Sequence, residues 1–332
     1  MKRLLILISL ILSGVIFTGS STVGVASLKF KEVKEKDEYT FLVCGLDNAA
    51  QNTDAIIVFN YNVKRNTATF IQIPRDTYVN SPNGIKKINS IYPTEVSSGA
   101  SPGDAMLKLS DFISEMLGVR IDGHISFTID ALARLIDAIG GVDLELPQDI
   151  SFKDPDGNNP SSLSAGVYHL SGKDAVRFIR YRNGYELGDL GRVDAQKFFL
   201  KAFVTKLKGS LNFKVVARSA FNSSEGVITN IKLLDILGIA LKIRGRIAVC
   251  DVNYANLPGV AAVLEDKKWY YFINRNASEQ LLSETGISLY NSFDKNEKLL
   301  NTNSEKTINF YYNKETGFKL FTDDDIMNLK VK

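Results

Sequence analysis

Three strand-like runs near the start of the main body constrain the fold more than any other feature of the sequence. Tyr39–Leu46, Ala55–Tyr61 and Thr67–Ile73 are rich in β-branched and aromatic residues and are separated by polar residues. Most positions within each run are apolar, without the alternation expected of a strand that has one face in water. Strands of that kind are usually buried on both faces. We therefore expect a sheet that other elements cover on both sides.

Helical patterns alternate with further strand-like runs along the rest of the chain. Pro102–Leu117 predicts a helix with Ser101 as its N-cap, and Asp130–Ile139 predicts a helix that ends at Gly140. This alternation predicts an α/β fold, a layered α-β-α domain with a central mixed sheet. The other expected elements are strands at His124–Thr128, Val142–Leu146, Arg246–Val252 and Trp269–Ile273, helical or mixed segments at Asp174–Tyr181 and Val193–Leu207, helices at Leu233–Ile243 and Ala277–Ser283, and a loop at Asp154–Ser164.

An uncharged apolar segment at residues 4–28 precedes this domain and follows Lys2 and Arg3. A helix needs about 20 residues to cross a bilayer, so we interpret residues 1–28 as a signal anchor, one N-terminal transmembrane helix. A cleaved signal peptide, with Gly24 and Ala26 near the cleavage point, is the alternative. The remaining predicted parts are a stalk at 29–38, the main domain at 39–287 and a C-terminal extension at 288–332.

The composition excludes several classes of function. The net charge of +3 over 332 residues is small for a dedicated nucleic-acid binder. Two Cys and two His cannot build an all-cysteine zinc site or a multi-histidine one. No GxSxG, P-loop or GxGxxG motif occurs, so a catalytic triad and the common nucleotide-binding loops have no support.

The segment 177–196, RFIRYRNGYELGDLGRVDAQ, contains four arginines and no lysine. Because a guanidinium group matches phosphate in a bidentate manner, such a cluster favours an anionic ligand. Arg180 and Arg182 would point the same way on an extended chain. Asp189, Arg192 and Gln196 have the spacing of neighbours on one helix face. The simpler interpretation is a solvated surface with ion pairs to acidic residues of the same segment.

Acidic residues follow or open the first strands. Asp47 follows the first run, Asp54 opens the second, and Arg75 and Asp76 follow the third. Sites in α/β proteins gather at strand ends, and a hard cation such as Mg²⁺ accepts one or two carboxylates together with phosphate oxygens and water. Each Asp taken alone is more often a turn residue or a helix cap.

Several ordered motifs together resemble the LytR-CpsA-Psr family, from about Tyr39 to Thr285. They are FLVCGLDN, TDAIIVF, FIQIPRDTYV, KINSIY, LIDAIGGVDLELP, LSGKDAVRFIRYR, GDLGRVDAQKFF, NLPGV and WYYFIN. The resemblance implies a bacterial enzyme of the cell membrane, a single-pass phosphotransferase with an extracytoplasmic catalytic domain. Its donor would be a glycopolymer on a polyprenyl-pyrophosphate carrier and its acceptor peptidoglycan, usually a muramic acid hydroxyl. The polymer, whether teichoic acid, capsule or another glycan, stays open.

The resemblance also assigns roles to individual residues. Asp47 and Asp54 match the acidic pair that holds Mg²⁺ (or Mn²⁺). Asp189 and Gln196 match polar positions at the same head-group site, and Ala195 stands where many members carry a second arginine. The matched arginines, which would surround the pyrophosphate, are Arg75, Arg180, Arg182 and Arg192.

Among these residues the resemblance implies catalytic roles for Arg75, Asp189 and Arg192. Asp189 is either a base for the acceptor hydroxyl or a group that orients Arg192. The apolar strands and helices would flank a groove for the isoprenoid tail. Two other functions compete with transfer: a non-catalytic module that binds polyprenyl phosphates or wall polymers, and a lipid pyrophosphatase that uses water as the acceptor. No nucleic-acid partner is expected.

Overall fold

The computed structural model describes the main domain and a few positions near the C-terminus. The described residues are 36–47, 52–80, 84–153, 160–181, 189–209, 225–232, 235, 239, 246, 249–264, 266–291, 321–322 and 324–325. The predicted anchor lies outside these residues. Within them, no helix combines the length and the apolar character that a bilayer crossing requires.

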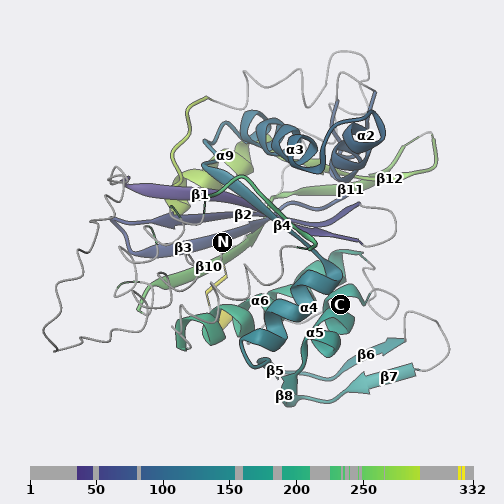
Figure 1. Ribbon diagram of the computed structural model, residues 1–332, viewed down its shortest axis with the longest axis vertical. Helices are drawn as coiled ribbons and strands as arrows, with labels where there is room; N and C mark the ends of the chain where they lie inside the picture. Colours follow the sequence, from purple (N-terminus) through teal and green to yellow (C-terminus); the bar gives the residue numbers. More distant parts are fainter. Residues whose placement is uncertain are drawn as a thin grey trace, which may run out of the picture.

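A six-stranded mixed sheet forms the centre of the domain (Figure 1). Its order is β10-β3-β2-β1-β4-β9. β1 and β2, β2 and β3, and β4 and β9 pair antiparallel, whereas β1 and β4, and β3 and β10, pair parallel. The expected central mixed sheet is thus confirmed. The strands are β1 (Glu38–Leu46), β2 (Thr53–Asn62), β3 (Thr67–Gln72), β4 (Gly123–Thr128), β9 (Val227–Thr229) and β10 (Asp251–Asn256).

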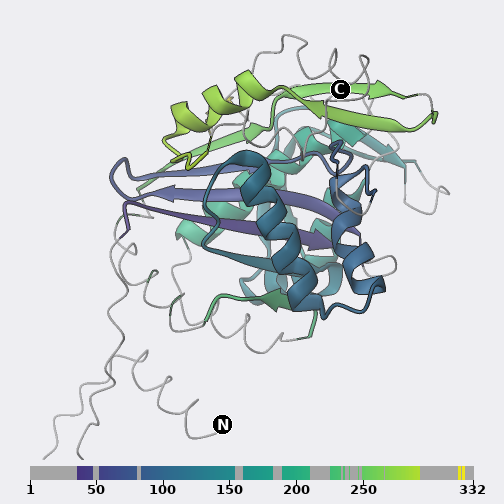
Figure 2. The ribbon, with the colours of Figure 1, turned by 90° about the horizontal axis from the view of Figure 1, so that it is seen from above.

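Helices cover both faces of this sheet. On one face lie α2 (Ile91–Ser97), which the short turn η1 (Ile88–Ser90) precedes, α3 (Pro102–Leu117), α9 (Arg275–Thr285) and the hairpin of β11 (Gly259–Val263) and β12 (Trp269–Ile273) (Figures 1 and 2). On the other lie α4 (Ile129–Ala138), α5 (Gly172–Arg180) and α6 (Asp189–Gly209) (Figure 1). The smaller hairpins are β5 (Val142–Leu146) with β8 (Gly166–Leu170), and β6 (Ile150–Lys153) with β7 (Pro160–Leu163).

Side chains that alternate along the strands pack into two separate cores, one on each face of the sheet. In β1, Leu42, Cys44 and Leu46 enter the core beneath α3 and α9, while Tyr39 and the partly buried Phe41 face the core formed with α4, α5 and α6. This division follows from the period of two along a strand. It confirms that the sheet is covered on both faces, as the continuous apolar runs predict.

Local signals explain most element boundaries. The hydroxyl of Ser101 accepts a hydrogen bond from the backbone N–H of Asp104, and Gly118 ends α3 in the left-handed conformation with φ 65°. Two predicted boundaries were wrong. The strand expected from Arg246 begins at Asp251, and the expected loop at Asp154–Ser164 contains β7. The pattern also missed α2, β8 and β11, which are short or rich in small residues.

Candidate active site

A cavity of about 270 Å³ lies where β1 and β4 end, next to α4, α5 and α6. Five residues that the sequence predicts for the site line it: Asp47, Asp54, Arg180, Arg192 and Gln196. The other lining residues are Gly45, Leu46, Ala55, Phe127, Ile129, Leu132, Ile179 and Tyr181. Charged groups from β1, β2, α5 and α6 therefore converge on one apolar-walled pocket, although they are spread over much of the sequence.

Antiparallel pairing of β1 and β2 brings the two acidic residues together. Leu46 at the end of β1 pairs with Thr53 at the start of β2, after a register shift at Gly45 and Leu46. The backbone N–H of Asp47 donates to the carbonyl of Asn52 at 3.1 Å and closes the connection. Asp47 and Asp54 thus line the pocket from neighbouring strand ends.

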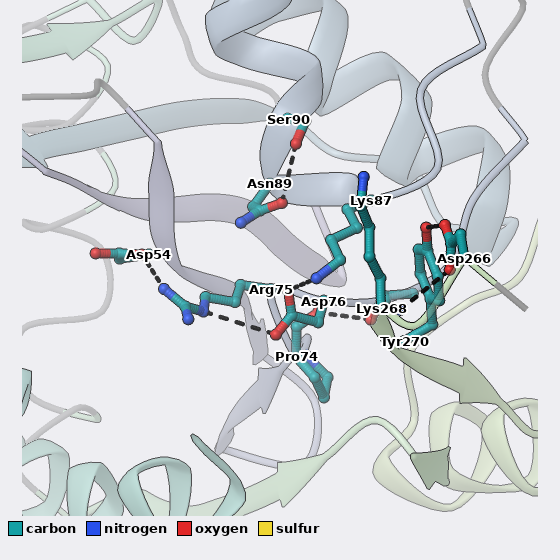
Figure 3. Close-up of polar contacts among 11 residues, drawn as sticks. Asp54, Pro74, Arg75, Asp76, Lys87, Asn89, Ser90, Asp266, Lys268 and Tyr270 are labelled. Atoms are coloured by element: carbon teal, nitrogen blue, oxygen red, sulfur yellow. Dashed lines mark hydrogen bonds and ion pairs between the residues drawn. The ribbon is translucent and has the colours of Figure 1, made fainter. Parts of the chain in front are cut away.

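Arg75 flanks the pocket through Asp54, which lines it. Figure 3 shows the contact between Arg75 and Asp54. Its Nη1 lies 2.7 Å from Oδ1 of Asp54, and its Nε lies 4.0 Å from Oδ2 of Asp76. Lys87 Nζ contacts the other oxygen of Asp76 at 2.7 Å. A chain of alternating charges therefore holds the Arg75 guanidinium at the Asp54 side of the cavity. The sequence predicted Arg75 here but gave no sign of Lys87.

Arg180 and Arg192 come from two different helices. Arg180 is the last residue of α5, so the segment predicted as helical or mixed is helical there. The cause is a strong helix start, since the Ser171 hydroxyl accepts a hydrogen bond from the N–H of Asp174. Arg192 lies in the first turns of α6 and is 2% exposed. A nearly buried guanidinium group beside a cavity favours an anionic occupant.

Gln196 joins α6 to both neighbouring layers. Its Nε2 donates to the carbonyl of Ile179 at 2.7 Å, and its Oε1 accepts from Nε2 of Gln72 at 2.7 Å. Gln72 is a site residue that the sequence reasoning missed. Its only signal was a polar side chain at the end of β3, directly after Phe70 and Ile71. Arg182 and the side chain of Asp189 lie outside the described residues, so their roles stay predictions.

The acidic pair suits a cation that a phosphate ligand shares. Within the described part of the chain, no cluster of three or more His, Cys, Asp or Glu side chains converges as an all-protein metal cage would require. Mg²⁺ needs only one or two carboxylates when phosphate oxygens and water complete its shell. Asp47 and Asp54 on one pocket wall meet that lower requirement.

An aromatic row crosses the sheet on the face that carries the cavity. Ring centroids are 6.4 Å apart for Phe41 and Phe59, 4.8 Å for Phe59 and Phe70, and 5.7 Å for Phe70 and Tyr254. Each pair lies directly opposite in neighbouring strands. Phe41 is four residues before Gly45, so both lie on one face of β1. The three phenylalanines are only partly buried and pack against the core formed with α4, α5 and α6.

The histidines and cysteines lie away from this pocket. His124 is buried in β4, where desolvation lowers the pKa of its imidazole. His169 lies in β8, and its exposed ring contacts Asp143 at 2.6 Å. That hydrogen bond lowers the pKa of Asp143. Cys44 is buried, and desolvation raises the pKa of its thiol.

A buried lysine connects α6 with the C-terminal part of the chain. Lys197 is 2% exposed, and its ammonium contacts Asp194 and lies 4.9 Å from the ring centroid of Phe321. Burial lowers the pKa of Lys197, while the Asp194 carboxylate opposes that shift. Phe321 and Tyr254 exchange two backbone hydrogen bonds of 2.8 Å at the edge strand β10. The ring thus covers a charge on the helix that carries Arg192.

Replacing Phe321 with alanine is expected to lower the free energy of unfolding by about 3 kcal/mol, because it removes a buried ring from the α6 core. Phe321→Leu keeps most of the apolar volume and should cost roughly half as much. Urea unfolding of the full chain measures both values. An unchanged midpoint in Phe321→Ala would show that this contact contributes nothing to the fold.

Comparison with known proteins places this arrangement in context. The model of the LytR_cpsA_psr family matches residues 18–286. The polyisoprenyl-teichoic acid–peptidoglycan teichoic acid transferase TagV of Bacillus subtilis is 28% identical over 249 residues, which cover 72% of this chain and 61% of TagV. The transferase of the same description named TagU, from Oceanobacillus iheyensis, is 26% identical over 273 residues, covering 76% of each chain.

The solved structures agree at the level of the fold. The crystal structure of Bacillus subtilis TagV superposes with a TM-score of 0.60 and 24% sequence identity. The superposition covers 76% of this chain and 96% of the TagV chain. The matched region covers 61% of TagV, so this chain spans about three fifths of the length of that relative.

Proposed function

The chain belongs to the LytR_cpsA_psr family, and from that premise we propose that it is a glycopolymer phosphotransferase of the bacterial cell wall. It moves a glycopolymer from a polyprenyl-pyrophosphate carrier to peptidoglycan. One observation carries this proposal: Asp47, Asp54, Arg180, Arg192 and Gln196, distant in sequence, line one cavity. The names of its transferase relatives TagV and TagU support the same reaction class.

The arginines bind the pyrophosphate head. Arg180 and Arg192 reach the cavity from α5 and α6, and Arg75 flanks it through Asp54. Each charge-assisted hydrogen bond to a phosphate oxygen contributes about 1.5–3 kcal/mol. Phosphoryl transfer depends mainly on positioning and on stabilising charge in the transition state. Fixed guanidinium groups on α5, on α6 and in the turn after β3 supply both the positioning and the charge stabilisation.

Asp47 and Asp54 would hold the divalent cation, Mg²⁺ or Mn²⁺. When bound, the cation would offset negative charge on the pyrophosphate. Asp54 also contacts Arg75 at 2.7 Å, so the same carboxylate orients a guanidinium group beside the phosphates. Gln196, held by Gln72 and Ile179, fixes α6 against this wall.

The chemistry is a displacement at phosphorus. The acceptor hydroxyl oxygen bonds to the phosphorus that carries the glycopolymer, and the bond from that phosphorus to the bridging oxygen breaks. Polyprenyl phosphate leaves with the bridging oxygen. The hydroxyl proton passes to a base, for which Asp189 at the start of α6 is the proposed residue; its alternative role is to orient Arg192.

The remaining parts of the proposal concern the lipid and the membrane. The aromatic row of Phe41, Phe59 and Phe70 offers apolar surface for the isoprenoid tail. Residues 4–28 would anchor the enzyme by a single membrane crossing, with the catalytic domain outside the cytoplasm. Such an anchor would keep the enzyme beside a donor whose tail stays in the bilayer.

The test is a product assay on the full chain with a polyprenyl-pyrophosphate glycan donor, peptidoglycan oligomers and Mg²⁺. We expect polyprenyl phosphate and glycan-linked peptidoglycan in equal amounts, with loss of both after chelation by EDTA. Release of polyprenyl phosphate without linked product would favour the pyrophosphatase. Donor binding without any release would favour the binding module.

A further inference from the structure

Two glutamine side chains bridge the space between β3 and α6. Gln72 Nε2 donates to Gln196 Oε1 at 2.7 Å. Gln72 is 8% exposed and lies on the same face of β3 as Phe70, which packs against the apolar core formed with α4, α5 and α6. A buried amide is costly unless it is hydrogen-bonded. An apolar side chain would fill the same place without that requirement, so packing alone does not account for Gln72.

The backbone of Gln72 is fixed within the sheet. β3 lies between β2 and β10, and Gln72 is directly opposite Ile57 in one strand and Asn256 in the other. Its carbonyl accepts a hydrogen bond from the N–H of Leu257 at 2.8 Å. Because neighbouring strands hold it from both sides, the Gln72 side chain projects from a rigid base. Three residues later the same chain carries Arg75.

Gln196 forms a hydrogen bond with the last turn of α5. The final carbonyls of a helix have no partner within it, and the Ile179 carbonyl accepts from Gln196 Nε2 at 2.7 Å. This carbonyl belongs to the peptide group that joins Ile179 to Arg180. Arg180 ends the helix and lines the cavity, and the extended residue Tyr181, which also lines it, is 3% exposed. Gln196 therefore holds the backbone from which the Arg180 side chain leaves.

Gln72 and Ile179 together fix the orientation of the Gln196 amide. A glutamine amide has one oxygen and two N–H groups. The Gln196 oxygen accepts from Gln72 and one N–H donates to Ile179, and no described residue accepts the second N–H. Turning the amide over would place its oxygen against the Ile179 carbonyl and its nitrogen against Gln72 Nε2, so both hydrogen bonds would be lost. The orientation therefore keeps a donor, not an acceptor, available on a residue that lines the cavity.

We propose that Gln72 is a positioning residue for phosphoryl transfer and acts through Gln196. It keeps the free N–H of Gln196 available to the pyrophosphate head and holds Arg180 in a constant position relative to Arg75. This inference rests on the proposed function. Gln72 itself is not among the residues that line the cavity, so its effect on the reaction passes through Gln196. A misplacement of about 1 Å can slow such a reaction by about 100-fold.

Gln72→Met keeps the length of the side chain but removes the donor. In the full chain, kcat for transfer should fall roughly 10-fold, because the Gln196 amide and Arg180 lose their fixed position, and the KM for the peptidoglycan acceptor should not change. Gln72→Leu removes the same donor and should give the same result. Thr285→Val is the matched control, because Thr285 is 2% exposed and donates to the Leu281 carbonyl at 2.9 Å in α9, on the other face of the sheet. An equal fall in Thr285→Val would indicate a general effect of stability and overturn the inference.

A double-mutant cycle separates positioning from an independent structural role. Gln196→Met should lower kcat more than Gln72→Met does, since it also removes the donor at the cavity and the hydrogen bond to Ile179. Adding Gln72→Met to Gln196→Met should then lower kcat no further. Losses that multiply in the double variant would overturn the inference, as would a wild-type kcat in a folded Gln72→Met protein. Both results leave the proposed function standing, whereas absence of transfer by the wild-type chain would refute the proposed function and this inference with it.

Discussion

Replacing Arg75 with alanine is expected to lower kcat for transfer by at least roughly 100-fold, the cost of losing one fixed donor to developing charge. The substitution removes a guanidinium group that lies 2.7 Å from Asp54 and 4.0 Å from Asp76. The Asp54 carboxylate would then lose a counter-charge next to an anionic substrate. Like charges at such distances repel strongly in a partly buried site.

Arg75→Lys separates charge from geometry. Lysine keeps the positive charge but cannot form a planar fork, so transfer should recover only in part. Arg177→Ala is the matched control, because Arg177 lies on α5 near Arg180, is 58% exposed at its side chain and pairs only loosely with Asp174 at 3.8 Å. Full transfer activity in a folded Arg75→Ala protein would contradict the proposed reaction.

Filling the cavity from β1 is expected to reduce transfer on the order of 100-fold, because the phosphates would be displaced from the arginines. Gly45 lines the cavity, and a Cβ there would lie 3.3 Å from the Cβ of Ala55. Gly45→Leu places a branched side chain in a space of about 270 Å³. Gly45→Ala adds one methyl group that a small shift of Ala55 can accommodate, so its effect should be much smaller.

Ala55→Leu fills the same cavity from β2 and guards against misfolding in the first variant. Donor binding and transfer should fall together in both leucine variants, while thermal unfolding stays within a few degrees of the wild type. Transfer at the wild-type rate in either folded variant would show that the cavity does not hold the pyrophosphate.

Local patterns in the sequence predicted many of the helices and strands. Val142–Leu146 and Trp269–Ile273 were predicted with the bounds that the structure has. The positions of Asp47, Asp54 and Arg75 followed from strand ends, because a sheet gathers the ends of its strands at one edge. The helix start at Ser171 was readable in the same way and was missed, so the predicted segment began at Asp174 instead of Gly172.

Contacts between distant segments were beyond this reasoning. Gln72 and Gln196 are 124 residues apart and meet only because α6 packs beneath β3. Lys87 and Asp266 likewise join the Arg75 network through the packing of the hairpin, which no local pattern specifies. Residue type and spacing could therefore predict which groups take part in the site, but not which groups hold them in place.

The contact between Phe321 and β10 bears on how this protein should be produced for study. The family match ends at residue 286, whereas Phe321 supplies the backbone partner of Tyr254 and the ring above Lys197. A recombinant fragment that ends at residue 286 would expose the edge strand β10, and an exposed edge strand readily pairs with a second molecule. It would also expose the buried ammonium group of Lys197 to solvent. Soluble, monodisperse samples should therefore retain the sequence through at least Asp325.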